Sequence, residues 1–359
     1  MQTFLPKCQA KICSIIIGGL YNIGISASGA NAKNTAYYNH ALAPPQLIPT
    51  NPSEVWQHLN TTGLLNKVAP VALHQKAKSF RMRIDSHQHF WQRELGHHNW
   101  LTEDMGTTYR DFLPDELRPH LKKSGIDKAV IMQAVPDMAE THYMLSLAHS
   151  TDFILGVVGW IDMQHIDAPY NIAKLSNNPY FKGIRPMIQD ILNDDWMLQP
   201  QFASAFKALT ELGLCFDALV KPRHLQQLIT LVDRYPNLKV VIDHAAKPNI
   251  AETQFSQWKE DIQALAKRPN VYCKLSGLVT EAGYNPNFDI LIPYMSHLLK
   301  SFGASRLMWG SDWPVLNLAT DYNQWVTLTE VFLATLTAEQ QTQIWSKTAT
   351  EFYRLQHLE

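Results

Sequence analysis

From Met82 onward, short apolar segments alternate with longer segments whose apolar residues recur at helical spacing. The short segments are rich in β-branched residues, and several are apolar almost throughout, which is typical of parallel strands covered on both faces. The longer segments, such as 201–212, 223–234 and 257–266, have the spacing of amphipathic helices. Repeated strand–helix units of this kind predict an α/β fold built on a parallel sheet.

Eight strand–helix units can be placed within residues 82–355. The predicted strands are 83–90, 128–134, 155–162, 182–187, 214–220, 239–244, 271–276 and 307–311. Eight units match one closed (β/α)8 barrel, a TIM barrel, better than an open doubly wound sheet. No glycine fingerprint for a dinucleotide follows any of these strands, which also disfavours a Rossmann fold. A last helix, 338–355, is predicted to pack on the outside of the barrel.

Residues 1–81 are predicted to be an extension outside the barrel domain of 82–359. Its apolar stretch, 12–30, is interrupted by glycines and an asparagine, so it resembles neither a spanning helix nor the clean core of a secretory signal. Three pieces, IIIGGLYNIGI, AYYNHALAPP and VWQHLNTTGLL, resemble fragments of the aldo/keto reductase family, of the type that oxidises L-fucose. No nicotinamide-binding portion accompanies them, so no dehydrogenase activity is implied. The extension is either a remnant of such a reductase or a poorly ordered leader.

Composition bears on partners and compartment. Lys and Arg number 31 against 32 Asp and Glu, so nothing indicates a nucleic-acid partner or an anionic membrane surface. The 4 cysteines form no CxxC pair, which disfavours a zinc finger and a redox dithiol. Cys215 and Cys273 lie in predicted strands, where a buried free thiol is usual. A reducing, cytoplasmic location fits best.

Polar residues interrupt the apolar pattern in the first predicted strand, RIDSHQHFW. Side chains alternate along a strand, so Asp85, His87 and His89 are predicted to face the same side. At the C-terminal end of a barrel strand, inward histidines lie where such barrels place catalysis. Buried histidines need polar partners, so packing alone explains the pair poorly.

The sixth and eighth predicted strands each end on a further candidate. His244 ends the apolar run of VVIDHAAKP, and Asp312 follows Gly310 and Ser311 in LMWGSDWP. An acid in this position can act as a general base for water or ligate a metal. The alternatives are an ordinary loop histidine and an aspartate that caps the next helix.

Other polar and aromatic residues near strand ends are candidates for binding a substrate. Arg185, before Pro186, can hold a carboxylate or orient hydroxyls, and a structural ion pair is its alternative. The further candidates for the wall of the site are Gln133, Trp160, Asp217, Lys274 and Trp313.

Five motifs in order, DSHQHFW, FKGIRP, VIDHAAKP, YCKLSGL and MWGSDWP, resemble those of the amidohydrolase superfamily, amidohydrolase family 2. Within it, the chain is similar to the branch of L-fuconolactonase, L-rhamnonolactonase and 2-pyrone-4,6-dicarboxylate lactonase, from residue 82 to 355. The resemblance implies an amidohydrolase-like barrel. Its implied catalytic residues are His87, His89, His244 and Asp312.

The resemblance also bears on metal binding. The lysine that bridges two metals in many members is not evident here, and Arg185 lies near that level instead, which argues against a binuclear centre. Members of this branch work with one divalent metal or with none, so the sequence leaves the metal open. Three histidines and an acid can bind one Zn²⁺. The implied ligands are His87, His89, His244 and Asp312.

The expected reaction is hydrolysis of a sugar lactone to its aldonic acid, and the reductase-like extension adds some weight to L-fuconolactone. Asp312 is expected to take a proton from the attacking water and to return it to the ring oxygen. The three histidines, directly or through a metal, are expected to stabilise the oxyanion.

The alternative functions are a lactonase for L-rhamnonolactone or a pyrone dicarboxylate, a superfamily decarboxylase and a non-catalytic sugar-binding barrel. A dicarboxylate demands several arginines, and beyond Arg185 only Arg110 and Arg223 are suitable.

Overall fold

The computed structural model describes residues 82–95, 101–253, 255–284, 286 and 288–356. The extension, residues 1–81, lies outside the described residues, so its division from the barrel and its resemblance to a reductase stay predictions. Within the described part of the chain, no helix is long and apolar enough to span a lipid bilayer.

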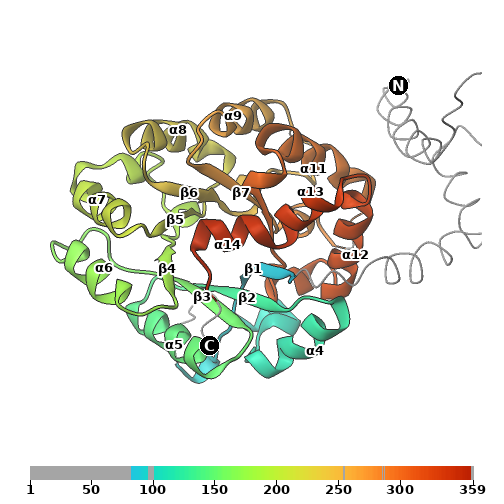
Figure 1. Cartoon of the computed structure of the whole chain (residues 1–359), viewed down its shortest axis with the longest axis horizontal. Helices are drawn as coiled ribbons and strands as arrows, with labels where there is room; N and C mark the ends of the chain where they lie inside the picture. The colour runs from blue at the N-terminus through green and yellow to red at the C-terminus, as the bar shows by residue number, and fades with distance from the viewer. Residues whose placement is uncertain (1–81, 96–100, 254, 285, 287, 357–359) are drawn as a thin grey trace, which may run out of the picture. The chain divides into compact units, whose positions relative to one another are not determined.

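Eight parallel strands form one sheet in chain order and nearly close into a barrel (Figure 1). The strands are β1 (Ile84–Gln88), β2 (Lys128–Met132), β3 (Ile154–Gly159), β4 (Phe181–Ile184), β5 (Cys215–Ala218), β6 (Lys239–Ile242), β7 (Val271–Leu275) and β8 (Leu307–Trp309). Each overlaps a predicted strand, so the predicted TIM barrel is confirmed. Cys215 and Cys273 are buried free thiols, also as predicted.

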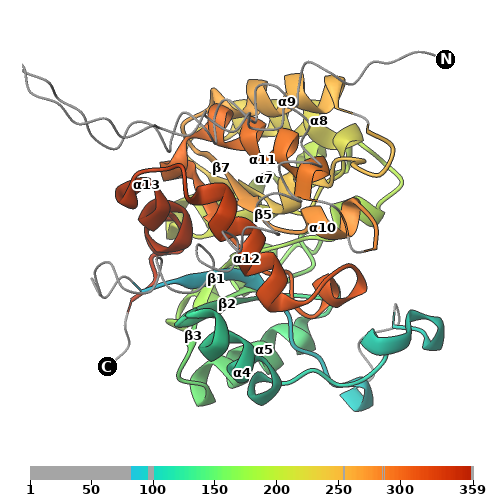
Figure 2. The same ribbon diagram turned by 90° about the vertical axis from the view of Figure 1, so that its right-hand side faces the viewer.

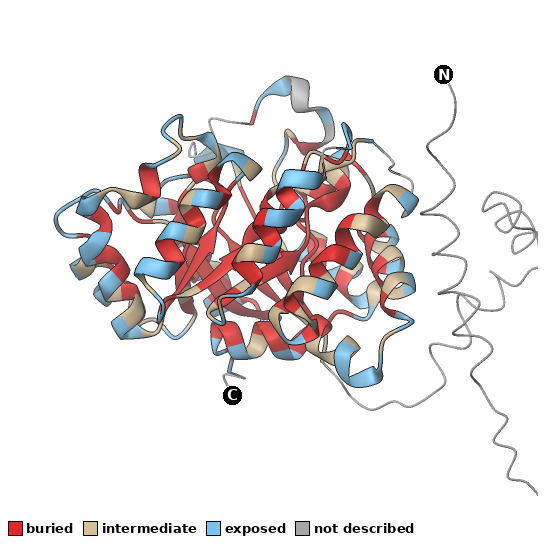
Figure 3. Cartoon of the chain, turned by 90° about the horizontal axis from the view of Figure 1, so that it is seen from above, coloured by how far each residue is buried: buried red, intermediate tan, exposed pale blue. Residues whose placement is uncertain are grey.

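Helices connect the strands and surround the sheet (Figure 1). They are α4 (Pro114–Ser124), α5 (Met138–Ser150), α6 (Ala168–Ser176), α7 (Ala203–Leu212), α8 (Leu225–Arg234), α9 (Ser256–Ala266), α10 (Leu278–Glu281), α11 (Phe288–Phe302) and α12 (Tyr322–Leu333). Figure 3 shows their inner faces buried against the sheet and their outer faces exposed, as amphipathic spacing requires.

A bulge in β1 corrects the prediction made for Asp85. Three residue steps along β1, from Asp85 to Gln88, match only two steps along β2, so the alternation of side chains is broken. Asp85 faces the outer layer, where its Oδ2 accepts a hydrogen bond from Tyr322 of α12 at 3.0 Å. The prediction that it faces the same side as His87 and His89 is therefore wrong.

The seam between β8 and β1 is closed by the segment that follows β8. The backbone N–H of Asp312 donates to the carbonyl of His87, and that of His89 donates to the carbonyl of Trp313, each at 2.8 Å. A parallel bridge between Gln88 and Trp313 completes the contact. The hydrogen bonds that close the barrel are thus the same ones that place Asp312 beside the two histidines.

Residues 338–353 close the barrel floor, the end of the barrel at which the strands begin. After α13 (Ala338–Thr342) and a π-helical turn (Gln343–Lys347), α14 (Thr348–Tyr353) lies across the barrel axis in Figure 1. Figure 2 shows α13 and α10 at opposite ends of the barrel. Phe352 and Tyr353 pack into the interior. Their apolar neighbours there are Ile84, Val130, Met132, Leu155, Val158, Cys215, Val241 and Met308.

This position of α14 corrects the prediction of a last helix on the outside of the barrel. The sequence predicted the helix, but the starts of the strands leave an apolar opening that the helix covers. One apolar surface covers the other, so the helix is part of the barrel core.

Replacing Phe352 by alanine removes a side chain that is 1% exposed from the barrel floor. We expect the free energy of unfolding to fall by about 3–5 kcal/mol, because lost burial adds to a residual cavity. Leu192→Ala is the matched control, since Leu192 is 94% exposed and its truncation should cost less than about 0.5 kcal/mol. Urea denaturation measures both, and similar losses in the two variants would contradict the role of α14 as a plug.

Candidate active site

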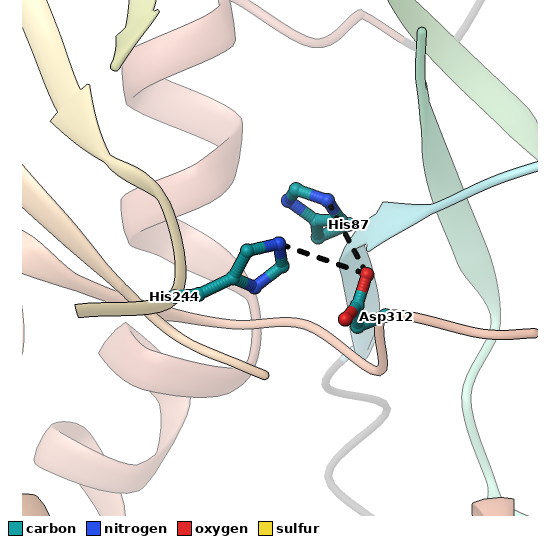
Figure 4. A group of neighbouring side chains, drawn as sticks. All are labelled: His87, His244 and Asp312. Carbon is teal, nitrogen blue, oxygen red and sulfur yellow. Dashed lines mark ion pairs between the residues drawn. The ribbon is translucent and has the colours of Figure 1, made fainter. Parts of the chain in front are cut away.

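Four side chains predicted to form the catalytic site lie together where the strands end. Asp312 Oδ1 lies 3.3 Å from His89 Nε2 and 3.7 Å from the Nε2 atoms of both His87 and His244. Figure 4 shows the rings of His87 and His244 side by side, both facing the Asp312 carboxylate. All four side chains are buried. Their catalytic role stays a prediction, which their geometry supports.

Two of these residues lie on left-handed backbone. His244 has a φ of 50° and Asp312 a φ of 62°, a conformation that costs energy in residues other than glycine and gathers at functional sites. The ring of His244 packs over Gly277, where an added Cβ would lie 2.5 Å from His244 Nδ1. Gly277 itself has a φ of +66°. Only glycine satisfies both the backbone conformation and the close approach of the ring.

The ammonium group of Lys274, on β7, lies directly behind His87 and is fully buried. Its Nζ lies 2.6 Å from Asp217 Oδ2, 2.9 Å from Asp243 Oδ1 and 3.1 Å from His87 Nδ1. Burial raises the pKa of Asp217 to about 6, although Lys274 opposes the shift. Burial also opposes ionisation of Asp243, but Lys274 and Arg185 outweigh it and lower the pKa of Asp243. The two carboxylates offset the cost of burying the ammonium charge.

Arg185 and Gln133, both predicted to bind substrate, extend this buried network. Arg185 Nη1 lies 3.2 Å from Asp243 Oδ2, and Nη2 donates to the carbonyl of Gln133. The Gln133 amide donates back to the carbonyl of Arg185 at 2.5 Å. Both side chains are buried, so the structure agrees with the structural ion pair that was the alternative for Arg185.

The two tryptophans predicted near the site differ in position. Trp313 is 2% exposed, with its ring centroid 5.9 Å from that of Phe90 and 5.2 Å from that of Phe112. It lies in an aromatic cluster, and its role in binding stays a prediction. Trp160 is half-buried just after β3 and keeps exposed surface. Its backbone N–H donates to Thr141 Oγ1 at 2.8 Å.

The hydrogen-bond partners fix which ring nitrogens carry protons. An ammonium group can only donate, so His87 Nδ1 accepts from Lys274 and the proton of the neutral ring lies on Nε2. Burial, with Lys274 and Arg185, lowers the pKa of His87 well below its usual range, which keeps the ring neutral. His89 Nδ1 faces the carbonyl of Met132 at 2.9 Å and must donate to it. In its neutral form His89 therefore accepts at Nε2, 3.2 Å from His87 Nε2.

Asp85 fixes the turn that precedes Asp312. Its Oδ1 accepts hydrogen bonds from the backbone N–H of Ser311 at 2.8 Å and of His87 at 3.2 Å. Burial raises the pKa of Asp85 to about 6, against the lowering effect of these hydrogen bonds. The carboxyl group thus ties β1 to the segment after β8 from the outer side of the sheet.

Three of the four predicted metal ligands form a group that could hold a metal ion. Ligand atoms of His87, His244 and Asp312 all lie within 4.8 Å of one another. Burial lowers the pKa of His87 and His244 well below the usual range, so protons compete weakly for their nitrogens. His89 lies outside this group. The type and the spacing of these ligand atoms fit a divalent metal ion. His87 could bind the ion through Nε2 only if the proton on Nε2 moved to Nδ1.

Sequence reasoning missed Asp243 and Ser276. Asp243 pairs with both Lys274 and Arg185, and Ser276 Oγ lies 2.9 Å from His244 Nδ1. Both residues stand inside the quoted motifs, next to His244 and Gly277 respectively. The sequence shows that both residues lie at the end of a strand. It does not show which residues they contact, because those partners come from neighbouring strands.

Comparison with known proteins shows which family the chain belongs to. Residues 84–355 match the family described as Amidohydrolase. The chain belongs to this family. The L-fucono-1,5-lactonase of Burkholderia ambifaria is 44% identical over 277 residues, which cover 76% of this chain and 96% of that protein. The L-fucono-1,5-lactonase of Burkholderia multivorans is 33% identical over 286 residues, with coverage of 76% and 96%. The resemblance stated from the motifs is confirmed.

Solved structures agree with this family. An amidohydrolase from Burkholderia multivorans with bound Zn is 33% identical, with a TM-score of 0.73 and coverage of 77% of this chain and all (100%) of that one. The 5-carboxyvanillate decarboxylase from Sphingomonas paucimobilis, at 13% identity, a TM-score of 0.55 and coverage of 77% and 100%, shares the fold alone.

Asp85→Asn should change how stability depends on pH. The folded pKa of about 6 lies above the usual 3.8, so between these values the folded protein binds a proton that the unfolded chain does not. Stability from Asp85 therefore grows as the pH falls from 7 to 5 and is lost as the pH rises through 6. His87 and His244 act in the opposite direction in both proteins and cancel in the difference. We expect the melting temperature of wild type minus that of the variant to be larger at pH 5 than at pH 7; an equal difference would contradict the raised pKa.

Proposed function

We propose that this chain hydrolyses a sugar lactone, L-fucono-1,5-lactone in preference to others, to the aldonic acid. The observation that carries the proposal is a buried carboxylate, Asp312, whose Oδ1 lies 3.3–3.7 Å from ring nitrogens of three histidines. Burial alone would raise its pKa, but the neighbouring His244 and His89 outweigh burial and lower it. A carboxylate ionised at neutral pH can accept a proton from water. Relatives named L-fucono-1,5-lactonase, 44% and 33% identical, support the choice of lactone.

In the first step, Asp312 takes a proton from water while the water oxygen bonds to the lactone carbonyl carbon. The carbonyl π electrons move to its oxygen, which becomes an oxyanion. His87 presents its Nε2–H to this oxyanion, and the buried ammonium of Lys274, 3.1 Å from Nδ1, strengthens that donor. His244, held through Nδ1 by Ser276, and His89 line the same space.

In the second step, the tetrahedral intermediate collapses and the bond from the carbonyl carbon to the ring oxygen breaks. The proton held by Asp312 passes to that oxygen, which leaves as a hydroxyl, and the carboxylate is restored. One lactone and one water give one hydroxy acid, whose carboxyl proton is released to solvent. A lactone is an activated ester, so one base and fixed donors suffice for the chemistry.

We propose Zn²⁺ as the ion that His87, His244 and Asp312 would take, because imidazole and carboxylate are donors that zinc prefers. A bound zinc ion polarises a carbonyl and acidifies water. We also propose a cytoplasmic location, since Cys215 and Cys273 are free thiols, as is usual in a reducing compartment.

The pairing of three arginines favours a neutral lactone over a dicarboxylate. Arg185 is committed to Asp243. Arg110 and Arg223, the two other arginines that could bind a dicarboxylate, are also paired. Arg110 pairs with Glu116 and Arg223 pairs with Asp194. A pyrone dicarboxylate would have to break such pairs to be held.

A panel of lactones tests the proposed function. We expect kcat/KM to be highest for L-fucono-1,5-lactone, lower for L-rhamnono-γ-lactone and lowest for 2-pyrone-4,6-dicarboxylate, because Arg185, Arg110 and Arg223 are already paired with acids. A pH-indicator assay, run with and without a chelator, measures the rates and the dependence on metal. Rates no faster than spontaneous hydrolysis for every lactone would defeat the proposal, as would a preference for the dicarboxylate.

Gly277→Ala tests the placement of His244. Its Cβ would lie 2.5 Å from His244 Nδ1 and should displace the ring, lowering kcat/KM by about a hundredfold. Gly283→Ala is the matched control, since Gly283 also has a positive φ, +93°, but nothing lies within 4 Å of its added Cβ. The control shares the backbone strain without the collision, so it should keep its activity. Equal losses in both variants would assign the effect to strain and count against His244.

A further inference from the structure

Asp217, deep in the barrel, has a carboxylate that is held from one side only. Its Oδ2 accepts hydrogen bonds from Lys274 Nζ and from Tyr353 Oη, both at 2.6 Å. Its Oδ1 has no hydrogen-bond partner among the described residues. The hydroxyl of Tyr353 is thus one of two donors that orient this carboxylate.

Tyr353 is held in place by the way α14 is anchored in the barrel floor. Lys239 Nζ, at the start of β6, donates to the carbonyl of Glu351, and Lys182 Nζ, on β4, donates to that of Arg354, each at 3.4 Å. Lysines at this position meet the negative end of the helix dipole. Cys215 Sγ adds a contact to the carbonyl of Phe352 at 3.2 Å. Three strands therefore fix the C-terminal end of α14.

The tyrosine contacts both members of the ion pair. Lys274 Nζ lies 5.5 Å from the centroid of the Tyr353 ring, in addition to the hydrogen bond from the hydroxyl to Asp217. Burial and Asp217 raise the pKa of Tyr353 well above its usual range, so the hydroxyl remains a donor at any working pH. Phenylalanine would keep the ring and lose only the hydroxyl.

We propose that Tyr353 is a positioning residue for the reaction: its hydroxyl holds Asp217 in the orientation that keeps Lys274 Nζ against His87 Nδ1. Lys274 lies between two carboxylates, Asp217 at 2.6 Å and Asp243 at 2.9 Å. Without the hydroxyl, Asp217 is free to turn and the ammonium can shift toward Asp243, away from the ring of His87. The last helix of the chain thus sets the strength of the donor that meets the oxyanion. The kinetic part of this inference rests on the proposed function.

Tyr353→Phe tests the proposal, with Tyr294→Phe as the matched control. Tyr294 is 3% exposed and its hydroxyl has no hydrogen-bond partner in the described structure, so its loss removes a buried hydroxyl that holds nothing. We expect kcat of Tyr353→Phe to fall by about tenfold on the best lactone, with KM unchanged, because a charge-assisted hydrogen bond is lost far from the substrate. Unchanged kcat, or a matching loss in the control, would overturn the proposal.

A double-mutant cycle with Asp217→Asn separates positioning from general destabilisation. If Tyr353 acts through Asp217, adding Tyr353→Phe to the Asp217→Asn protein should cost almost nothing further. A second loss of about tenfold, as large as in the wild-type background, would show that Tyr353 acts by another route and would contradict the proposal.

Nitrogen NMR of ¹⁵N-histidine-labelled protein supplies a readout that needs no substrate. We expect wild-type His87, assigned with His87→Gln, to show a bare Nδ1 and a protonated Nε2, and Tyr353→Phe to shift both signals toward a mixture of tautomers. Identical His87 signals in the two proteins would overturn the positioning role. A wild type that hydrolyses no lactone would defeat the proposed function alone, because the NMR comparison still decides the role of Tyr353.

Discussion

The buried ammonium group of Lys274 is the constraint on which the site depends. A charge without exposed surface is tolerated only when it is paired, and here Asp217 and Asp243 supply the pairing. Asp243 in turn binds Arg185, so two cations and two anions fill the middle of the barrel. Because an ammonium cannot accept, this cluster also dictates the tautomer of His87 and, through it, the direction of the hydrogen bonds toward the mouth.

Fold and site share their hydrogen bonds at the barrel seam. The backbone of His87 and His89 pairs with that of Asp312 and Trp313, so the barrel cannot close without bringing the acid to the histidines. Asp85 secures the same seam from the outer layer, and α14 secures the floor beneath the charged cluster. The site is therefore held from the seam and from the floor.

Much of this architecture could be predicted from the sequence, for reasons that also explain the failures. Apolar runs located all eight strands, because strands buried on both faces carry little else. Alternation placed His87 and His89 on one side correctly, but it failed for Asp85, because the pairing of β1 with β2 slips between Asp85 and Gln88. The sequence placed Arg185 near the end of its strand. Its pairing with Asp243 could not be predicted, because Arg185 follows β4 and Asp243 follows β6. The last helix was predicted, but the surface that α14 covers depends on how the eight strand starts come together.

The central claim is that Asp312 acts as the base, and Asp312→Asn tests it most directly because the amide keeps the shape of the side chain and cannot take the proton. Hydrolysis of L-fucono-1,5-lactone should fall to the spontaneous rate, while calorimetric titration shows that the variant still binds the lactone. The account predicts this separation of turnover from binding. A variant that hydrolyses the lactone at the wild-type rate would contradict it.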